Sequence, residues 1–402
     1  MKKENHLLGA ILLISGTSIG AGMLALPVIT SFGGFFFSFC FFVLIWALML
    51  TTAFFFLDVT LATKGETNFI SMTGKTLGKT GKVICWIFYL LLLYALLAAY
   101  ISACTPLFSL AFSSFFSITI PPFIVPFFLP ILFAGFIYLG TKGVDYLNQI
   151  LMTGLILSYV LLIGSIPPHI EQVRFVHNDF ILSLLAAPII ITSFGYHIII
   201  PTLTTYMGHR IKLLKKALLI GSIIPLIVYV IWEALILGAV PLESLITAWS
   251  KGVPATEPLA IFLQSTWISS IARFFSFFAI ITSFLGISLS LSDFLTDGFK
   301  LKKTRKGKWI AIALTFIPPL LFIFSNENSF YIALDYAGAF VAILLGILPC
   351  LMVLTLKNHR WYQSFYGKAT LYLIMCLFLG IVVINLLEKQ GCFTSFLQPY
   401  LP

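Results

Sequence analysis

Long apolar runs separated by short polar segments make up most of the chain. A run of about 20 apolar residues can cross the hydrocarbon core of a bilayer as a helix. The pattern predicts about eleven such spans, at residues 7–31, 34–62, 83–112, 122–141, 148–166, 182–206, 218–240, 267–292, 309–325, 331–356 and 370–387. We therefore expect an all-α polytopic membrane protein with one integral membrane domain over residues 1–402.

Small residues interrupt the first span in its middle. The segment from Gly16 to Pro27 has glycine at positions 16, 20 and 22 within an otherwise apolar run. Hydrocarbon cannot satisfy the backbone groups that a broken helix sets free. Irregular backbone at this depth is therefore found where it is buried in protein or lines a polar cavity. Broken helices of this kind hold the solute in secondary transporters, so the break predicts a binding site.

A second break lies about half a chain later. The sixth span carries Pro188, the sequence SFGYH at residues 193–197, and Pro201. Either break alone is also compatible with a simple proline kink. Together, in the first and sixth spans, they predict a five-plus-five repeat, and the second repeat is inverted because five is an odd number. The expected repeats cover residues about 7–166 and 182–356, followed by an additional C-terminal helix at about 370–387.

The composition agrees with a membrane protein and excludes a soluble domain. Hydrophobic residues make up 60% of the chain and charged residues 9%, a balance that a water-facing surface does not allow. The six cysteines are scattered without paired spacing. We interpret them as buried hydrophobic residues rather than a disulfide or metal framework, and we expect no cofactor other than a coupling ion.

Basic residues are distributed unequally between the two ends of the spans. With a cytoplasmic N-terminus, the outer side receives Arg174, Lys251 and Lys389, with Arg273 near the start of the eighth span. The other 20 of the 24 Lys and Arg residues then fall on the cytoplasmic side. This asymmetry predicts a cytoplasmic N-terminus and a periplasmic or external C-terminus. It also accounts for the net charge of +10 without a nucleic-acid partner.

Five segments of the chain resemble a known family. They are residues 16–27, 94–102 (YALLAAYIS), 192–197 (TSFGYH), 282–286 (TSFLG) and 291–297 (LSDFLTD). With these motifs the chain resembles the bacterial hydroxy/aromatic amino-acid permeases, the tyrosine- and tryptophan-specific transporters of the amino-acid/polyamine/organocation superfamily. The resemblance implies a leucine-transporter-type fold, uptake of an aromatic amino acid across the bacterial inner membrane, and coupling to protons.

The expected function is secondary active uptake of an aromatic amino acid, with tyrosine favoured, by proton symport with alternating access. The alternatives are a sodium-coupled or broader-specificity amino-acid permease and, in another class, a solute channel lined by the same polar breaks. An enzyme is not expected, because the sequence has no HExxH, CxxC or P-loop motif and no large extramembrane domain. The expected partners are the amino-acid substrate and the lipid bilayer.

The chemistry of the breaks suits a zwitterion. Glycines let backbone approach a ligand closely, and amide groups at the start of a half-helix attract a carboxylate. Carbonyls freed in the sixth span can accept the ammonium group, and aromatic residues there can flank a ring. Close packing of small residues between helices is the structural alternative. The predicted substrate-binding residues are Thr17, Ser18, Gly20, Ala21, Gly22, Tyr100, Ser193, Phe194, Gly195 and Tyr196.

Two ionisable residues inside spans are candidates for proton coupling, because such groups are costly in a membrane. His197 follows the second break, and Glu233 lies in the seventh span. A neutral imidazole bonded to a freed carbonyl is the alternative for His197. In the sodium alternative, hydroxyls of the eighth span, chiefly Ser288 and Ser292, join carbonyls of the first break in an oxygen cage.

Acidic residues also gather at the predicted cytoplasmic ends of spans, close to many lysines. We expect them to form an inner-gate network that breaks and re-forms during alternating access, with static charge pairing as the alternative. The predicted gating residues are Asp58, Asp145, Asp293 and Asp297.

Overall fold

The computed structural model of the chain is helical and describes residues 6–63, 68–117, 119–139, 144–302, 304–326, 328–356 and 360–400. Among these residues, nine helices are long and apolar enough to cross a membrane, and the bent pair His6–Ser18 and Ala21–Thr30 makes a tenth span. The nine are Phe35–Ala62, Phe69–Ser114, Leu147–Ser165, Phe180–Tyr206, Ile211–Ala239, Thr266–Gly298, Arg305–Ser325, Ser329–Leu354 and Phe365–Lys389.

The elements are as follows in chain order. The first half contains α1 (His6–Ser18), η1 (Ala21–Leu24), α2 (Leu26–Thr30), α3 (Phe35–Ala62), α4 (Phe69–Phe116), η2 (Val125–Phe127), α5 (Phe128–Leu139), α6 (Val144–Ser165), η4 (Pro167–His169), η5 (Gln172–Val176), α7 (Phe180–Ser183), η6 (Leu184–Ala186), α8 (Ala187–Ser193), η7 (His197–Ile199) and α9 (Ile200–Tyr206). The second half contains α10 (Ile211–Ala239), α11 (Leu242–Ser250), α12 (Thr256–Phe262), α13 (Thr266–Gly298), α14 (Arg305–Ser325), α15 (Ser329–Val341), η8 (Ala342–Ile347), α16 (Leu348–Leu354), α17 (Arg360–Gln363), α18 (Phe365–Lys389), α19 (Thr394–Leu397) and η9 (Gln398–Tyr400).

The predicted count of about eleven spans is too high for the described residues, and the difference lies in the predicted span 122–141. Within that range the shorter apolar helix Val125–Phe136 does not reach membrane-spanning length. The segment starts with the 3₁₀ turn η2, which contains Pro126. The α-helix α5 begins only at Phe128. Proline has no amide hydrogen and clashes with the preceding turn, so the prolines at 121, 122 and 126 prevent a longer helix.

The third predicted span begins earlier than expected. Helix α4 starts at Phe69, where the Asn68 side chain accepts a hydrogen bond of 2.8 Å from the amide of Ser71. Gly78 interrupts its regular geometry with φ 72°, a conformation that glycine adopts readily. The first turns of α4 carry lysines at 75, 79 and 82. Because the prediction is based on apolar runs, it leaves this charged segment out of the span.

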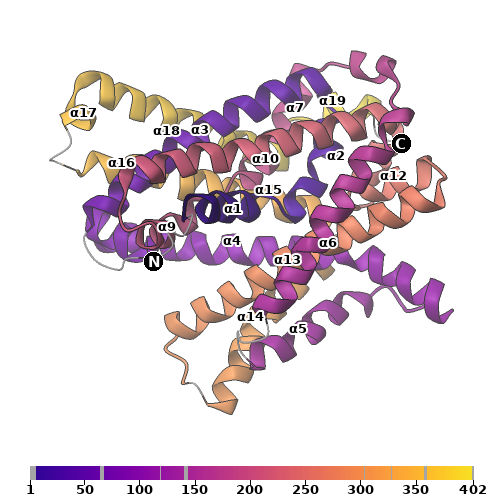
Figure 1. Cartoon of the computed structure of the whole chain (residues 1–402), viewed down its shortest axis with the longest axis horizontal. Helices are drawn as coiled ribbons and strands as arrows, with labels where there is room; N and C mark the ends of the chain where they lie inside the picture. The colour runs from indigo at the N-terminus through magenta and orange to yellow at the C-terminus, as the bar shows by residue number, and fades with distance from the viewer. Residues whose placement is uncertain are drawn as a thin grey trace.

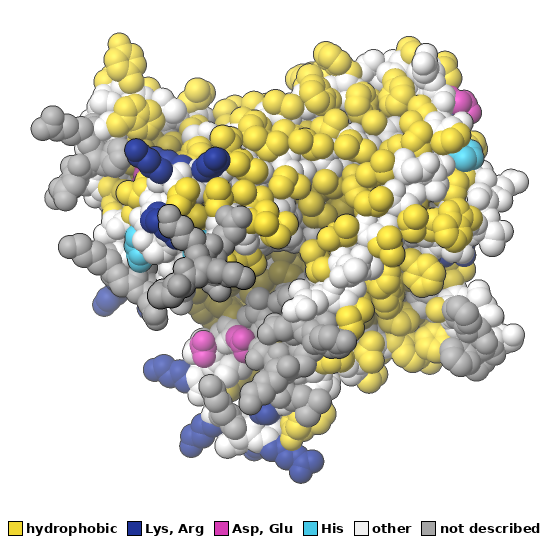
Figure 2. Space-filling model, viewed as in Figure 1, with side chains coloured by type: hydrophobic (Ala, Val, Ile, Leu, Met, Phe, Trp, Pro, Cys, Tyr) yellow, Lys and Arg dark blue, Asp and Glu magenta, His cyan; other side chains and the backbone are white. Residues whose placement is uncertain are grey.

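The spans form two groups of packed helices. Helix α10 packs against α1 and α3, and α13 packs against α4, α6 and α14. Figure 1 shows α3, α4 and α10 along the long axis of the molecule, while α5, α6, α13 and α14 cross them at an angle. Figure 2 shows apolar side chains over the middle of this face and Lys and Arg side chains towards its left and lower left. An apolar belt with charged ends is the arrangement that a bilayer requires.

Both predicted breaks are present in the helices. In the first span, α1 and the following segment Ala21–Thr30 meet at an angle of 45°. The intervening Gly20 is extended, with φ −166° and ψ −156°. In the sixth span, α8 ends at Ser193, and η7 begins only at His197. The chain therefore leaves regular helix within both spans.

Candidate functional site

One tyrosine on α10 joins the two breaks. The hydroxyl of Tyr229 lies 2.6 Å from the carbonyl oxygen of Ser18 and 2.9 Å from that of Ser193. These carbonyls end α1 and α8, where no following helical turn is available to bond them. Trp232, one turn later on α10, donates its indole N–H to the carbonyl of Met23 at 3.1 Å. Helix α10 thus places one hydroxyl donor between two carbonyls that the breaks set free and an indole donor at a third.

Helix α13 contacts the first break from another side. The amide of Ala21 donates a hydrogen bond of 3.0 Å to the hydroxyl of Ser283. A Cβ atom on Gly20 would lie 2.5 Å from the same hydroxyl oxygen, and one on Gly22 would lie 3.1 Å from the hydroxyl oxygen of Ser193. Glycine at 20 and 22 therefore lets the first break approach α13 and α8 closely.

A cavity of about 490 Å³ lies between these elements. Eight of the ten predicted substrate-binding residues line it: Thr17, Ser18, Gly20, Ala21, Gly22, Tyr100, Ser193 and Gly195. Apolar side chains of α4 and of the segment Ser329–Ile347 form further parts of the wall, including Leu93, Leu96, Val341 and Leu345. The cavity thus has backbone groups of both breaks at one side and an apolar surface at another, a combination that suits small-molecule binding.

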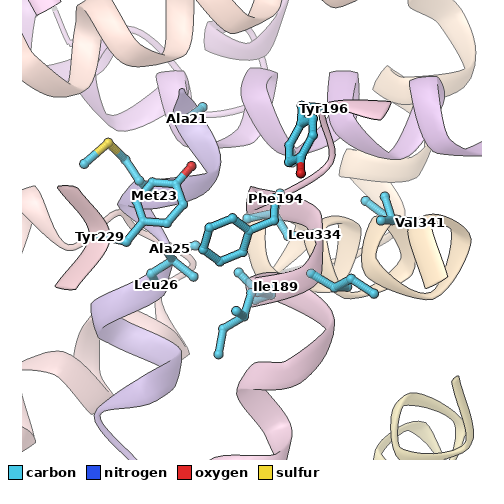
Figure 3. Close-up of a cluster of buried hydrophobic side chains, with 14 of the residues drawn as sticks. Ala21, Met23, Ala25, Leu26, Ile189, Phe194, Tyr196, Tyr229, Leu334 and Val341 are labelled. Atoms are coloured by element: carbon cyan, nitrogen blue, oxygen red, sulfur yellow. The ribbon is translucent and has the colours of Figure 1, made fainter. Parts of the chain in front are cut away.

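The other two predicted residues are not among those that line the cavity. Phe194 is fully buried and packs edge-on against Tyr229, with ring centroids 5.3 Å apart. Tyr196 is fully buried beside His197, at 5.2 Å between centroids. Figure 3 shows the Phe194 ring directed towards Tyr229 and the first span, while Tyr196 lies apart from it. Both rings belong to the apolar core around the sixth span.

His197 contacts α3 and does not line the cavity. Its Nε2 atom lies 2.9 Å from the hydroxyl of Thr52, and the ring faces Phe56 edge-on at 6.3 Å. The side chain is fully buried. The imidazole therefore links the segment after the second break to α3.

Glu233 is fully buried and contacts the end of α2. The Thr30 hydroxyl is hydrogen-bonded to Oε1 of Glu233 and lies 2.6 Å from the carbonyl oxygen of Leu26. A hydroxyl has one proton to donate, and neither the Leu26 carbonyl nor an ionised carboxylate can donate one. Both contacts are satisfied together when Glu233 carries a proton and donates it to Thr30.

A second cavity, of about 600 Å³, adjoins the first. The two cavities share Tyr89, Ile198 and Ser290 in their walls. Asp293 and Asp297 of α13 line the second cavity. The space at the two breaks thus continues towards the end of α13 that carries these two acidic residues.

Comparison with known proteins identifies the family. The model of the "Tryptophan/tyrosine permease family" matches residues 3–387. The chain belongs to this family. It is a permease, therefore, and the resemblance given by its sequence motifs is confirmed.

Two relatives and one solved structure show how far the similarity extends. The permease is 30% identical to "Tyrosine-specific transport system 1" of Haemophilus influenzae, over 95% of this chain and 96% of that protein. It is 30% identical to "Tryptophan-specific transport protein" of Shigella flexneri, over 95% of both chains. Its fold is similar to that of MhsT in a crystal structure with L-phenylalanine, at a TM-score of 0.62 and 16% identity, over 94% of this chain and 98% of the other.

The structure describes the side chains of three of the four acidic residues predicted to form a gate. Asp293 and Asp297 line the same cavity. Asp58 instead accepts a hydrogen bond from the hydroxyl of Tyr362, in the short helix α17. The side chain of Asp145, at the start of α6, lies outside the described residues.

The two hydroxyls predicted for a sodium site are not in the cavity wall. Ser288 is fully buried and donates to the carbonyl of Leu285 on its own helix at 3.1 Å. Ser292 is also buried. Ser283 and Ser290 of the same helix do line the cavity.

Sequence reasoning missed several residues of the site. Tyr229 was not expected to bond the breaks, Ser283 was considered only as one of several hydroxyls of a sodium cage, and the cavity wall includes Asn148 and Thr192 as well. The signal for Tyr229 was its position one turn before Glu233, because residues four apart share a helix face. Nothing in the sequence distinguishes Ser283 from the other hydroxyls of α13.

Proposed function

We propose that the permease takes up an aromatic amino acid, tyrosine, by proton symport with alternating access. The cavity at the two breaks is the observation that carries this proposal, because backbone of both breaks and the ring of Tyr100 line it. Membership of the tryptophan/tyrosine permease family supports the substrate class. The printed names of its relatives, for tyrosine and for tryptophan, support an aromatic ring.

We place the substrate backbone between the breaks. The amides near Gly20 and Gly22 receive the carboxylate, since small residues permit close approach and a half-helix start is electropositive. The ammonium group faces the end of α8, near Ser193 and Gly195. The aromatic ring lies against the apolar wall that includes Val341. Phe194 and Tyr196 support this arrangement from within the core.

The proposed topology places the N-terminus in the cytoplasm and the C-terminus in the periplasm or outside. The excess of Lys and Arg at one end of the spans supports this orientation. Breaks in the first and sixth spans support two inverted repeats in a leucine-transporter-type fold. The second cavity then opens towards the cytoplasm, and Asp293 and Asp297 belong to the inner gate.

Two residues remain proposed carriers for the coupling proton. Glu233 contacts the half-helix α2 through Thr30, and His197 contacts α3 through Thr52. Protonation of either group therefore changes a contact with a helix next to one of the breaks. Glu233→Gln and His197→Gln separate the two proposals. The essential carrier is the residue whose replacement abolishes accumulation against a gradient while exchange continues.

The proposal is tested by uptake of radiolabelled tyrosine into proteoliposomes under an inward proton gradient in sodium-free buffer. We expect accumulation that a protonophore abolishes and that tryptophan and phenylalanine inhibit more than leucine. A requirement for sodium would show that sodium, and not the proton, is the coupling ion. Flux that only follows the gradient of tyrosine itself would indicate a channel, and no tyrosine flux would refute the substrate.

A further inference from the structure

An ion pair between a buried aspartate of α15 and a solvent-accessible lysine of α18 lies away from the site at the breaks. The ammonium group of Lys389 is 3.4 Å from Oδ2 of Asp335. Asp335 is only 3% exposed, although it lies inside a predicted membrane span. The ammonium group also lies 5.2 Å from the ring centroid of Tyr336. Ionisable residues in a membrane span are costly, so a functional role is the default expectation.

A second carboxyl group shares this environment. Glu388 precedes Lys389 on α18, and the charges that act on Asp335 are those of Glu388 and Lys389. Two ionised carboxylates and one ammonium group leave a net charge of −1. An unbalanced charge is expensive to bury. One proton on either carboxyl group makes the cluster neutral.

Three buried polar atoms of the cluster have no hydrogen-bond partner within the described part of the chain. They are Oδ1 of Asp335, Oε2 of Glu388 and Nδ2 of Asn385. Asn385 is 1% exposed and lies three and four residues before Glu388 and Lys389, on the same face of α18. A buried amide donor and two open carboxylate oxygens thus remain beside a single cation.

Among the described residues, the charged groups of α4, α14 and the segment before α15 are remote from the cluster. Helix α8 has no ionisable side chain. The lysines of α4 end at residue 82, whereas Ser102 of α4 bonds Ser329 at the start of α15 at 2.8 Å. At 1.5 Å per residue, they lie roughly 20 Å or more from Asp335. The cations of α14 lie at its beginning, at the opposite end from Phe322, which contacts Tyr336. Lys251, near the start of α15, is exposed.

Helix α15 connects the cluster to the substrate cavity. Gly338 lies one turn after Asp335 on α15, and Val341 lies one turn after Gly338, so each is a neighbour of the next along the helix surface. A Cβ atom on Gly338 would lie 2.0 Å from the carbonyl oxygen of Pro188, so α15 and α8 are in direct backbone contact. Val341 and Leu345 line the cavity. A π-helical turn, η8, begins at Ala342, and such turns are frequent at functional sites.

We propose that Asp335 and Glu388, held beside Lys389, share one exchangeable proton and form an outer proton-binding site of the transport cycle. The proton comes from the outer solution and adds to a carboxylate oxygen, so the charge of the cluster changes from −1 to zero. Proton binding changes the packing of α18 against α15, and α15 transmits this change to α8. The inference rests on the proposed proton coupling, but it does not depend on which residue near the breaks carries the proton across.

The first test is tyrosine exchange in proteoliposomes, with tyrosine on both sides, as a function of outer pH. We expect the wild-type rate to depend on outer pH and Asp335→Asn and Glu388→Gln each to flatten that dependence. Lys389→Gln removes the cation that favours ionised carboxylates, so the midpoint should move up by roughly one pH unit. Lys389→Arg keeps the cation and should leave the midpoint at its wild-type value. Wild-type pH profiles in both carboxyl variants would overturn the proposal.

The second test does not require tyrosine transport, and so it separates this proposal from the proposed function. The unfolding temperature of the purified permease in detergent is measured against pH for the wild type and for the Asp335→Asn/Glu388→Gln double variant. A titrating site makes the two curves differ in shape. Parallel curves would refute the site even if uptake is proton-driven. Different curves without tyrosine flux would retain the site and refute the substrate assignment.

Discussion

The amide nitrogen of Ala21 lies 3.0 Å from the hydroxyl oxygen of Ser283, a residue 262 positions later in the chain. This hydrogen bond fixes the first break to α13. The same hydroxyl lies only 2.5 Å from the place that a Cβ atom of residue 20 would take, so the hydrogen bond requires glycine there. The broken first span is therefore tied to α13 by one side chain, in addition to its bonds with Tyr229 and Trp232 of α10.

Replacing Ser283 with alanine should weaken tyrosine transport. The Ala21 amide loses its acceptor, at a cost of about 1–2 kcal/mol, which corresponds to roughly tenfold in the apparent affinity. Uptake kinetics in proteoliposomes provide the measurement. Ser290→Ala is the matched control, because Ser290 also lines the cavity but bonds its own helix, to Gly286, at 2.8 Å. Equal effects of the two variants would contradict this role of Ser283.

Gly20→Ala should impair transport, whereas Gly164→Ala on α6 should not. The new Cβ at residue 20 would lie 2.5 Å from the Ser283 hydroxyl, while nothing lies within 4 Å of one at residue 164. The Ser283 side chain must turn away, so its bond to Ala21 is lost. The combined Gly20→Ala/Ser283→Ala variant should then be little worse than Ser283→Ala alone, because both changes remove one interaction. Strictly additive losses would show that Gly20 acts in another way.

Tyr229→Phe should lower transport more than it lowers membrane insertion. The phenyl ring keeps its packing against Phe194, but the carbonyls of Ser18 and Ser193 lose their shared donor. A buried acceptor left without a partner costs about 1–3 kcal/mol. Tyr159→Phe is the control, because its hydroxyl bonds the carbonyl of Val228 at 2.8 Å, within α10. Uptake rates per inserted permease should fall several-fold only for Tyr229→Phe.

Gly338→Ala should destabilise the permease. Its Cβ would lie 2.0 Å from the backbone oxygen of Pro188, and backbone cannot turn aside as a side chain does. Overpacking of this kind typically costs about 1–3 kcal/mol. Gly380→Ala on α18 meets nothing within 4 Å and should be neutral or slightly stabilising. Thermal unfolding in detergent compares the two variants, and an unchanged midpoint for Gly338→Ala would disprove the close contact.

The breaks in the first and sixth spans follow directly from the sequence. Glycines at 20, 22 and 195 and prolines at 27, 188 and 201 lie within apolar runs, and a break in a membrane-spanning helix occurs where it is buried in protein or lines a cavity. The sequence does not determine the directions of the side chains at an interruption. Phe194 and Tyr196 lie where the chain is no longer helical, so no periodicity relates them to the cavity, and the structure places both in the core.

Other differences between prediction and structure have equally specific causes. Asp335 lies inside the predicted tenth span, and the rule that singled out Glu233 applies to it as well. Its partner Lys389 is some fifty residues away in sequence and could not be assigned. The predicted span 122–141 is longer than the helix described there, because hydropathy counts the prolines at 122 and 126 as members of an apolar run, whereas proline favours the first turn of a helix over its interior.

The common wall of the two cavities determines what size of molecule this conformation accepts. Tyr89, Ile198 and Ser290 border both spaces, so an elongated compound can place an amino-acid head at the breaks and a bulky tail beside Asp293. A substrate of ordinary size leaves the second space to water. A compound that fills both cavities would block the conformational change, because the helices cannot close around it. We therefore expect that compounds larger than the transported amino acid inhibit the permease.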